Sequence, residues 1–140
     1  MGVRLFVDTS VWSLALRRND PAAIPEVRAL GEALEQGDLV FTTGLVLQEL
    51  LQGFRGPRAR DAIIRRFASL PFLVPERSDY IEAAGVRNEC RRKGVQVGTI
   101  DALFAELCLS NDLTILTTDH DFHRIADILP LSCWRSTATG

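Results

Sequence analysis

One stretch of this 140-residue chain constrains its fold more than any other, the apolar run at residues 102–109. Drawn as a helix, the run is apolar almost all round, which is typical of a helix buried on every side. Such a helix needs packing layers around it, and a chain of this length can supply them within one domain. Asp101 lies directly ahead of the run. Because a buried charge is costly unless something pairs with it, the sequence predicts a partner for this carboxylate.

Short β-branched and aromatic runs alternate with helical patterns along the rest of the chain. The predicted strands are residues 3–8, 38–43, 72–74 and 113–117, with an edge strand within 129–134. Predicted helices include residues 26–36, a short one at 44–53, one from Pro57 to about Leu70, and one capped by Ser78 that runs to Lys93. The alternation predicts an α/β fold with a parallel sheet.

Three further acidic residues stand in apolar surroundings. Asp8 and Asp119 follow predicted strands, where open α/β sheets place their ligands, and Glu49 lies on a short leucine-rich helix. Each has a simpler explanation when taken alone, such as a helix cap for Asp8 or a solvated polar stripe for Glu49. Asp121 lies three residues after Thr118, which resembles a capping box with aspartate in place of glutamate, and we expect it to act as a cap.

Together, Asp8, Glu49, Asp101 and Asp119 favour a metal site. Carboxylates that meet in one crevice repel, and a pair about 4 Å apart costs on the order of 4 kcal/mol at an effective dielectric near 20. A hard divalent cation turns that repulsion into binding, and Mg²⁺ prefers oxygen ligands. Metal-bound water is a nucleophile at neutral pH, and a second metal can stabilise a leaving oxygen. We therefore expect these four residues to bind the metal and to catalyse phosphodiester hydrolysis.

The charge balance permits a nucleic-acid partner. Without the four proposed site carboxylates, 14 of the 18 acidic residues remain against 16 basic residues, and 15 of those bases are arginine. Arginine can bond two phosphate oxygens at once. Five arginines lie between residues 55 and 66. Genomic codon bias explains the arginine content equally well, and a solvated helix face explains the cluster.

Other features bound the compartment in which the protein works. No apolar run approaches the length that spans a bilayer, and the N-terminus lacks the pattern of a secretory signal. Cys90, Cys108 and Cys133 are scattered and odd in number, so we expect buried, reduced thiols. These observations predict a cytoplasmic protein without a membrane partner.

Four motifs resemble those of a known family, and they occur in that family's order. The sequence is similar to PIN-domain ribonucleases, specifically the VapC toxins of prokaryotic toxin–antitoxin modules, over residues 3–134. The motifs are Val7-Asp8-Thr9-Ser10, Gln48-Glu49-Leu50, Thr99-Ile100-Asp101-Ala102 and Thr118-Asp119-His120-Asp121-Phe122.

The resemblance implies a PIN-like three-layer sandwich, with a five-stranded, mainly parallel sheet and helices on both faces. It implies one PIN domain at residues 1–135 and a flexible tail at 136–140. It also implies acidic metal ligands at Asp8, Glu49, Asp101 and Asp119, with Mg²⁺ or Mn²⁺ as the cofactor of endonucleolytic RNA cleavage. Asp121 falls in the last motif, where its role varies, so the resemblance leaves open that it supports a ligand or binds a second metal. The expected partners are an RNA substrate, a small antitoxin of the VapB type and a second copy of the chain. Trp12 and Leu16 are either docking points for these proteins or core residues.

Two alternatives remain open within this fold, a housekeeping RNA-processing nuclease and a non-catalytic domain that binds RNA or protein. Other acid-bearing folds fit less well. A receiver domain needs a lysine near the site, and the single lysine is Lys93 on a charged helix. A haloacid-dehalogenase phosphatase needs an aspartate where Ser10 stands. His120 and His123 have no third zinc ligand near them in the sequence.

Overall fold

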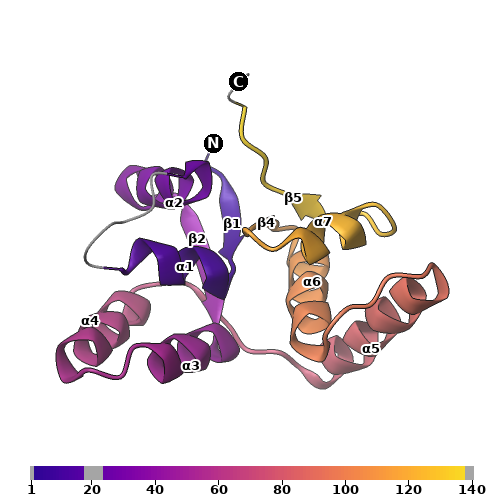
Figure 1. The fold of residues 1–140 in the computed structure, drawn as a ribbon, viewed down its shortest axis with the longest axis horizontal. Coiled ribbons are helices and arrows are strands. Elements are labelled where there is room, and N and C mark those ends of the chain that lie inside the picture. Colours follow the sequence, from indigo (N-terminus) through magenta and orange to yellow (C-terminus); the bar gives the residue numbers. More distant parts are fainter. Residues whose placement is uncertain (1, 18–23, 138–140) are drawn as a thin grey trace.

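The computed structural model describes residues 2–17 and 24–137. Within these residues, five strands and seven helices alternate along the chain (Figure 1). The strands are β1 (Arg4–Val7), β2 (Leu39–Thr43), β3 (Phe72–Leu73), β4 (Thr114–Leu116) and β5 (Ser132–Cys133). The helices are α1 (Thr9–Ala15), α2 (Pro25–Gln36), α3 (Gly44–Gly53), α4 (Pro57–Ala68), α5 (Arg77–Arg92), α6 (Thr99–Asn111) and α7 (His120–Ala126).

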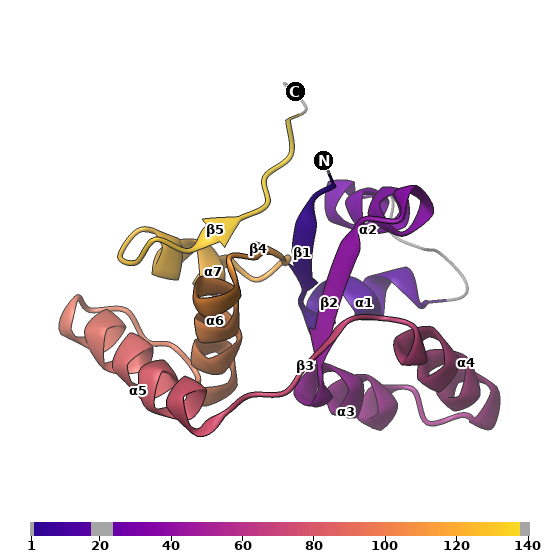
Figure 2. The same cartoon turned by 180° about the vertical axis from the view of Figure 1, so that it is seen from behind.

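The strands form one sheet in the order β3-β2-β1-β4-β5, and every neighbouring pair is parallel. The chain moves outward from β1 to β3 and then returns past β1 to β4. Because right-handed crossovers place helices on opposite faces when this direction reverses, the helices divide into two groups. Figures 1 and 2 show α1–α4 on one side of the strands and α5–α7 on the other. The predicted α/β fold with a five-stranded parallel sheet is confirmed.

The core sits where α6 meets the central strands. Every residue from Ala102 to Cys108 is buried, as the all-round apolar pattern predicts. Phe104 packs against Phe6 of β1 with ring centroids 5.1 Å apart. Cys90 and Cys108 are free and buried, as predicted, whereas Cys133 is free but only half-buried.

Trp12 belongs to the core, which is one of the two roles that the sequence leaves open for it. Its side chain is 2% exposed and packs against Phe67 of α4, with ring centroids 4.9 Å apart and the ring planes tilted by 51°. The ring hides apolar surface that α1 and α4 could not bury alone. Leu16 is half-buried and packs against the same core.

The start of α5 differs from the prediction. Ser78 is not its cap, because Glu76 occupies the N-cap position and forms a capping box with Asp79. The Glu76 backbone N–H donates to Asp79 Oδ2 at 2.7 Å. This reciprocal pair satisfies two backbone donors, whereas a serine cap alone satisfies one.

Two further observations concern membranes and the tail. No helix among the described residues is long and apolar enough to cross a membrane. Ser136 and Thr137 are exposed and lie outside any helix or strand, and the rest of the predicted tail, residues 138–140, lies outside the described residues.

Candidate metal centre

Asp8 is buried at the carboxyl end of β1, the central strand of the sheet. Its backbone N–H donates to Leu116 O at 2.9 Å, which extends the pairing of β1 with β4. Its Oδ2 accepts hydrogen bonds of 2.8 Å from Ser10 Oγ and from Thr117 Oγ1. Asp8 occupies the N-cap position of α1, but its side chain makes no capping hydrogen bond. The carboxylate is therefore held by two hydroxyls, and the cap explanation fails.

Burial raises the pKa of Asp8, and repulsion from Asp119 adds to the rise. The hydrogen bonds from Ser10, Thr117 and the Thr9 backbone act in the opposite direction, because they stabilise the charged form. The hydroxyls thus help to keep a buried carboxylate ionised, which is the form that binds a cation.

Glu49 of α3 contacts Thr9, the residue that follows Asp8. Its Oε1 accepts a 2.8 Å hydrogen bond from Thr9 Oγ1, which joins α3 to the first residue of α1. The polar stripe that could have explained Glu49 lies elsewhere on α3, where the exposed residues Gln48 and Gln52 bond each other. Glu49 is half-buried, so the solvated-stripe explanation does not describe it.

Asp101, Asp119 and Asp121 form the tightest acidic cluster. One carboxylate oxygen from each lies within 4.8 Å of the other two. Asp101 comes from the first turn of α6, whereas Asp119 is the N-cap of α7 and accepts from the Asp121 backbone N–H at 2.9 Å. Arg124 Nη1 contacts Asp121 Oδ1 at 3.2 Å and neutralises part of the charge.

The prediction that Asp121 acts as a cap after Thr118 is wrong. Asp119 caps α7, and Asp121 presents its carboxylate to the cluster and to Arg124. The local sequence suits either Asp119 or Asp121 as the cap of α7. Because α6 places Asp101 beside them, the Asp121 carboxylate joins the acidic cluster.

The pKa of Asp101 is raised to about 6. Burial is the largest cause, followed by repulsion from Asp119, Asp8, Asp121 and Glu49. The other three carboxylates chosen from the sequence, together with Asp121, therefore lie close enough to Asp101 to act on it. A set that offers only oxygen ligands and carries excess negative charge fits a hard divalent cation such as Mg²⁺ or Mn²⁺.

This raised pKa predicts that the metal-free protein loses stability as the pH rises from about 4 to about 6. Below the ordinary value of 3.8, Asp101 is protonated in both the folded and the unfolded state. Above it the unfolded state releases the proton first, so rising pH favours unfolding until the folded pKa is passed.

Asp101→Asn should flatten this part of the pH profile, and in EDTA near neutral pH it should raise the melting temperature by a few degrees. Thermal melts of wild type and variant between about pH 3.5 and 8 measure the difference. Asp61→Asn, on the exposed surface of α4, is the matched control and should follow wild type. A pH profile that Asp101→Asn leaves unaltered would contradict the coupling.

Several polar residues of this site escape prediction from the sequence. The hydroxyls of Thr9, Ser10 and Thr117 orient Glu49 and Asp8, and Asp119 N–H also donates to Thr117 Oγ1 at 3.0 Å. The sequence signal that could have identified these hydroxyls is a threonine or serine close to an acid at the end of a strand.

Glu106 is another polar residue that the apolar pattern of residues 102–109 does not single out. It is buried among the apolar residues of α6. It accepts a hydrogen bond from Ser110. Burial raises its pKa, with smaller contributions from Asp79 and Glu82.

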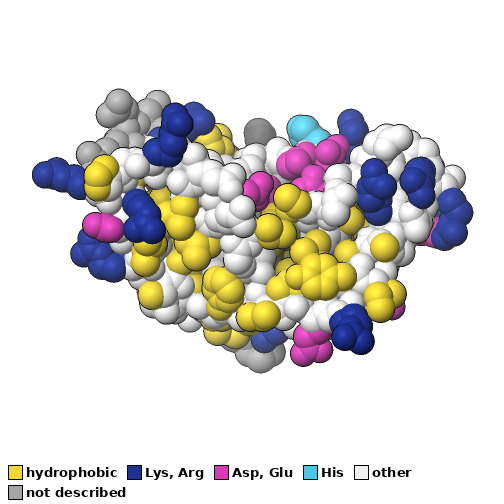
Figure 3. Space-filling view, turned by 90° about the horizontal axis from the view of Figure 1, so that it is seen from below, with side chains coloured by type: hydrophobic (Ala, Val, Ile, Leu, Met, Phe, Trp, Pro, Cys, Tyr) yellow, Lys and Arg dark blue, Asp and Glu magenta, His cyan; other side chains and the backbone are white. Residues whose placement is uncertain are grey.

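The acidic side chains gather at the carboxyl edge of the sheet. In Figure 3 they lie near the middle of the molecule beside an apolar area, with lysine and arginine side chains toward both ends. The five arginines at residues 55–66 are exposed on α4 and the loop before it. Their contact with RNA stays a prediction.

An all-parallel sheet with this strand order and clustered acids at its carboxyl edge defines a small α/β protein whose carboxylates could hold a cation. The sequence matches the PIN-domain family over residues 5–128. The chain belongs to the PIN-domain family.

Solved toxin–antitoxin structures share the fold. VapBC2 from Rickettsia felis, bound to a DNA fragment from its promoter, matches with a TM-score of 0.72 at 20% identity over 95% of this chain and 100% of the other. DNA-bound VapBC from Salmonella typhimurium matches with a TM-score of 0.71 at 20% identity over 94% and 97% of the two chains.

A third similar structure is that of VapC20 from Mycobacterium tuberculosis, a toxin that cleaves the sarcin–ricin loop. It matches with a TM-score of 0.64 at 21% identity over 91% of this chain and 98% of the other. At these identities, the likeness shows a common fold. No curated protein matches the sequence.

Proposed function

We propose that this chain is a metal-dependent endoribonuclease and the toxin of a VapBC-type toxin–antitoxin pair. The observation that carries the proposal is the cluster of Asp101, Asp119 and Asp121, which acts electrostatically together with Asp8 and Glu49. Membership of the PIN-domain family and the fold shared with VapC20 support it. The proposed site residues are Asp8, Glu49, Asp101 and Asp119, and Asp121 joins them on the strength of its position.

In this proposal each side chain has a physical task. Asp101 and Asp119 hold the cation, and the unrelieved repulsion between them drives its binding. Ser10 and Thr117 fix the direction of the Asp8 carboxylate, and Thr9 fixes that of Glu49. When bound at these residues, Mg²⁺ would supply an activated water and would neutralise charge on the phosphodiester. Fixed ligands lower the cost of reorganisation when charge develops.

The proposed partners are RNA, a VapB-type antitoxin and a second copy of the chain, in the cytoplasm. An active ribonuclease harms its own cell, so the proposal requires an inhibitor. An arginine from the antitoxin could pair with the clustered carboxylates, since the guanidinium matches a carboxylate with two hydrogen bonds.

Expression in a bacterial host tests this proposal. Wild type should arrest growth, and co-expression with a small neighbouring antitoxin frame should restore it. Asp101→Asn, expressed to the same level, should leave growth normal because it removes a cation ligand. If soluble wild-type protein that binds Mg²⁺ leaves growth normal, the toxin assignment is wrong and a housekeeping processing nuclease becomes the better account. Failure to cleave any RNA would favour the non-catalytic alternative.

A further inference from the structure

Arg124 on α7 places a positive charge at the edge of the acidic cluster. Its Nη1 donates to Asp121 Oδ1 at 3.2 Å, and among the ion pairs of the described residues this is the one that involves a carboxylate of the candidate metal centre. The Arg124 side chain is 63% exposed, so another molecule can reach it. An exposed pair of this kind adds little to stability. A larger effect of Arg124 must therefore act on what approaches the cluster.

Most of the hydrogen-bond donors of Arg124 remain available. A guanidinium carries five N–H groups, and the structure commits one of them to Asp121. Because the planar fork of arginine matches both carboxylates and phosphates, the same side chain can hold Asp121 with one edge and a phosphate with another. Arg124 engages Oδ1 of Asp121, so Oδ2 is left for a cation.

The charge of the cluster explains why an anionic substrate needs a base at this place. The carboxylates that lie close enough to Asp101 to act on it are Asp8, Glu49, Asp119 and Asp121. When all five are ionised, one divalent cation offsets two of their five charges, so the centre stays negative and repels a phosphodiester. A guanidinium at the edge of the cluster lowers that repulsion where the RNA backbone must enter.

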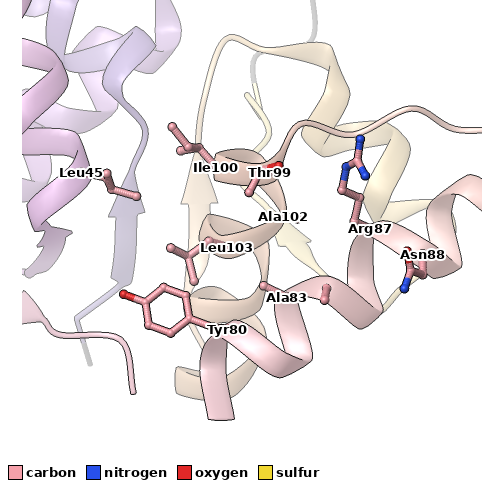
Figure 4. A pocket seen from close by; sticks show the side chains of 10 residues that line it. Leu45, Tyr80, Ala83, Arg87, Asn88, Thr99, Ile100, Ala102 and Leu103 are labelled. Carbon is pink, nitrogen blue, oxygen red and sulfur yellow. The ribbon is translucent and has the colours of Figure 1, made fainter. Parts of the chain in front are cut away.

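Arg87 is a second arginine near the start of α6, and the structure holds it differently. Its Nε donates to Val97 O at 2.8 Å, which ties α5 to the segment before α6. Arg87 and Thr99 both line a groove of about 400 Å³ between α3, α5 and α6 (Figure 4). Between the residues that the structure describes, no ion pair joins Arg87 to the acidic cluster. Arg124 is therefore the better placed of the two to act at the metal centre.

We propose that Arg124 binds an RNA phosphate near the bond that is cleaved, while its Nη1 group holds Asp121. The inference rests on the proposed function, in which Asp121 and the other clustered acids bind the cation. Arg124 then has two effects of opposite sign. It attracts the anionic substrate, and it competes with the cation for the negative charge of Asp121. A residue that only stabilised α7 would have neither effect.

Metal affinity is the first readout. Arg124→Ala should bind Mn²⁺ about two- to fivefold more tightly than wild type, because the competing positive charge is gone. A titration followed by the electron paramagnetic resonance of free Mn²⁺ measures the difference. Arg92→Ala is the matched control, since Arg92 is 70% exposed and pairs with Glu89 on α5 at the same spacing of three residues. It should bind Mn²⁺ as wild type does, and circular dichroism melts establish that both variants fold.

RNA affinity is the second readout. It is measured with a labelled RNA of mixed sequence in the Glu49→Gln background, which should leave the RNA intact. In millimolar Mg²⁺, Arg124→Ala should bind this RNA about tenfold more weakly than its parent, as loss of a charge-assisted hydrogen bond to phosphate predicts. In EDTA the remaining carboxylates repel the backbone, so the difference should disappear. Arg124→Lys should recover part of the affinity, because it keeps the charge and loses the planar fork. Arg92→Ala should have the same small effect in Mg²⁺ and in EDTA.

Neither readout requires cleavage, so the inference and the proposed function can fail separately. A chain that gives both expected results but cleaves no RNA would refute the nuclease proposal alone. A match between Arg124→Ala and Arg92→Ala in either readout would overturn the inference and leave Arg124 as a surface ion pair. Weaker Mn²⁺ binding by Arg124→Ala would also overturn it, as would a loss of RNA affinity that persists in EDTA.

Discussion

Glu49→Gln should lower the rate of RNA cleavage by roughly two orders of magnitude or more, as loss of a positioned catalytic group commonly does. The substitution is nearly isosteric, and glutamine Oε1 can still accept the hydrogen bond from Thr9 Oγ1. The fold should therefore remain intact while the negative charge is lost. Cleavage of a labelled RNA in Mg²⁺ measures the effect, and circular dichroism checks the fold.

Glu35→Gln is a suitable control, because Glu35 is exposed on α2. It removes the same charge from the surface and should retain full activity. If folded Glu49→Gln cleaves RNA as fast as this control, then Glu49 only joins α3 to α1 and is not part of the catalytic set.

Addition of Mg²⁺ or Mn²⁺ should raise the melting temperature, because a ligand that binds only the folded state stabilises it. At about 100 times the dissociation constant, the gain is about 2.7 kcal/mol. The clustered carboxylates repel one another in the metal-free protein, so the cation also relieves an existing cost. A melt in millimolar metal against one in EDTA measures the shift.

The double variant Asp8→Asn, Asp101→Asn should abolish this shift. Its metal-free form should melt above wild type, since two raised-pKa carboxylates have lost their charge. An exposed pair on α4 and α5, Asp61→Asn with Glu82→Gln, controls for lost net charge and should keep the metal response. Equal shifts in wild type and in the Asp8, Asp101 variant would rule out a shared site at these residues.

The alternation of strands and helices could be predicted from the sequence because it depends on local apolar patterns. The run at residues 102–109 must be buried on every side, and it forms the central helix α6. The start of α5 is harder to predict, because Ser78, Glu76 and Asp79 all suit a helix N-terminus. Which of them caps depends on backbone geometry that composition does not specify.

Asp8 and Asp119 could be selected from the sequence because parallel strands bring their carboxyl ends to one edge. Asp101 and Glu49 could be selected because each is a charge in an apolar helix. The hydroxyls that orient them could not, since Thr117 and Asp8 are 109 residues apart and their contact depends on the register of β1 with β4. Trp12 shows the same limit. Nothing near it in the sequence reveals Phe67, the residue that covers its ring.

The place of β1 at the centre of the sheet has a consequence for protein synthesis. Asp8 leaves the ribosome before its hydroxyl partner Thr117, which follows 109 residues later, and before the clustered Asp119. A nascent chain that stops before β4 therefore lacks both the strand that holds Asp8 and one wall of the acidic cluster. The centre is complete only after the chain has been made as far as Asp121, so a fragment released before that point carries no assembled site.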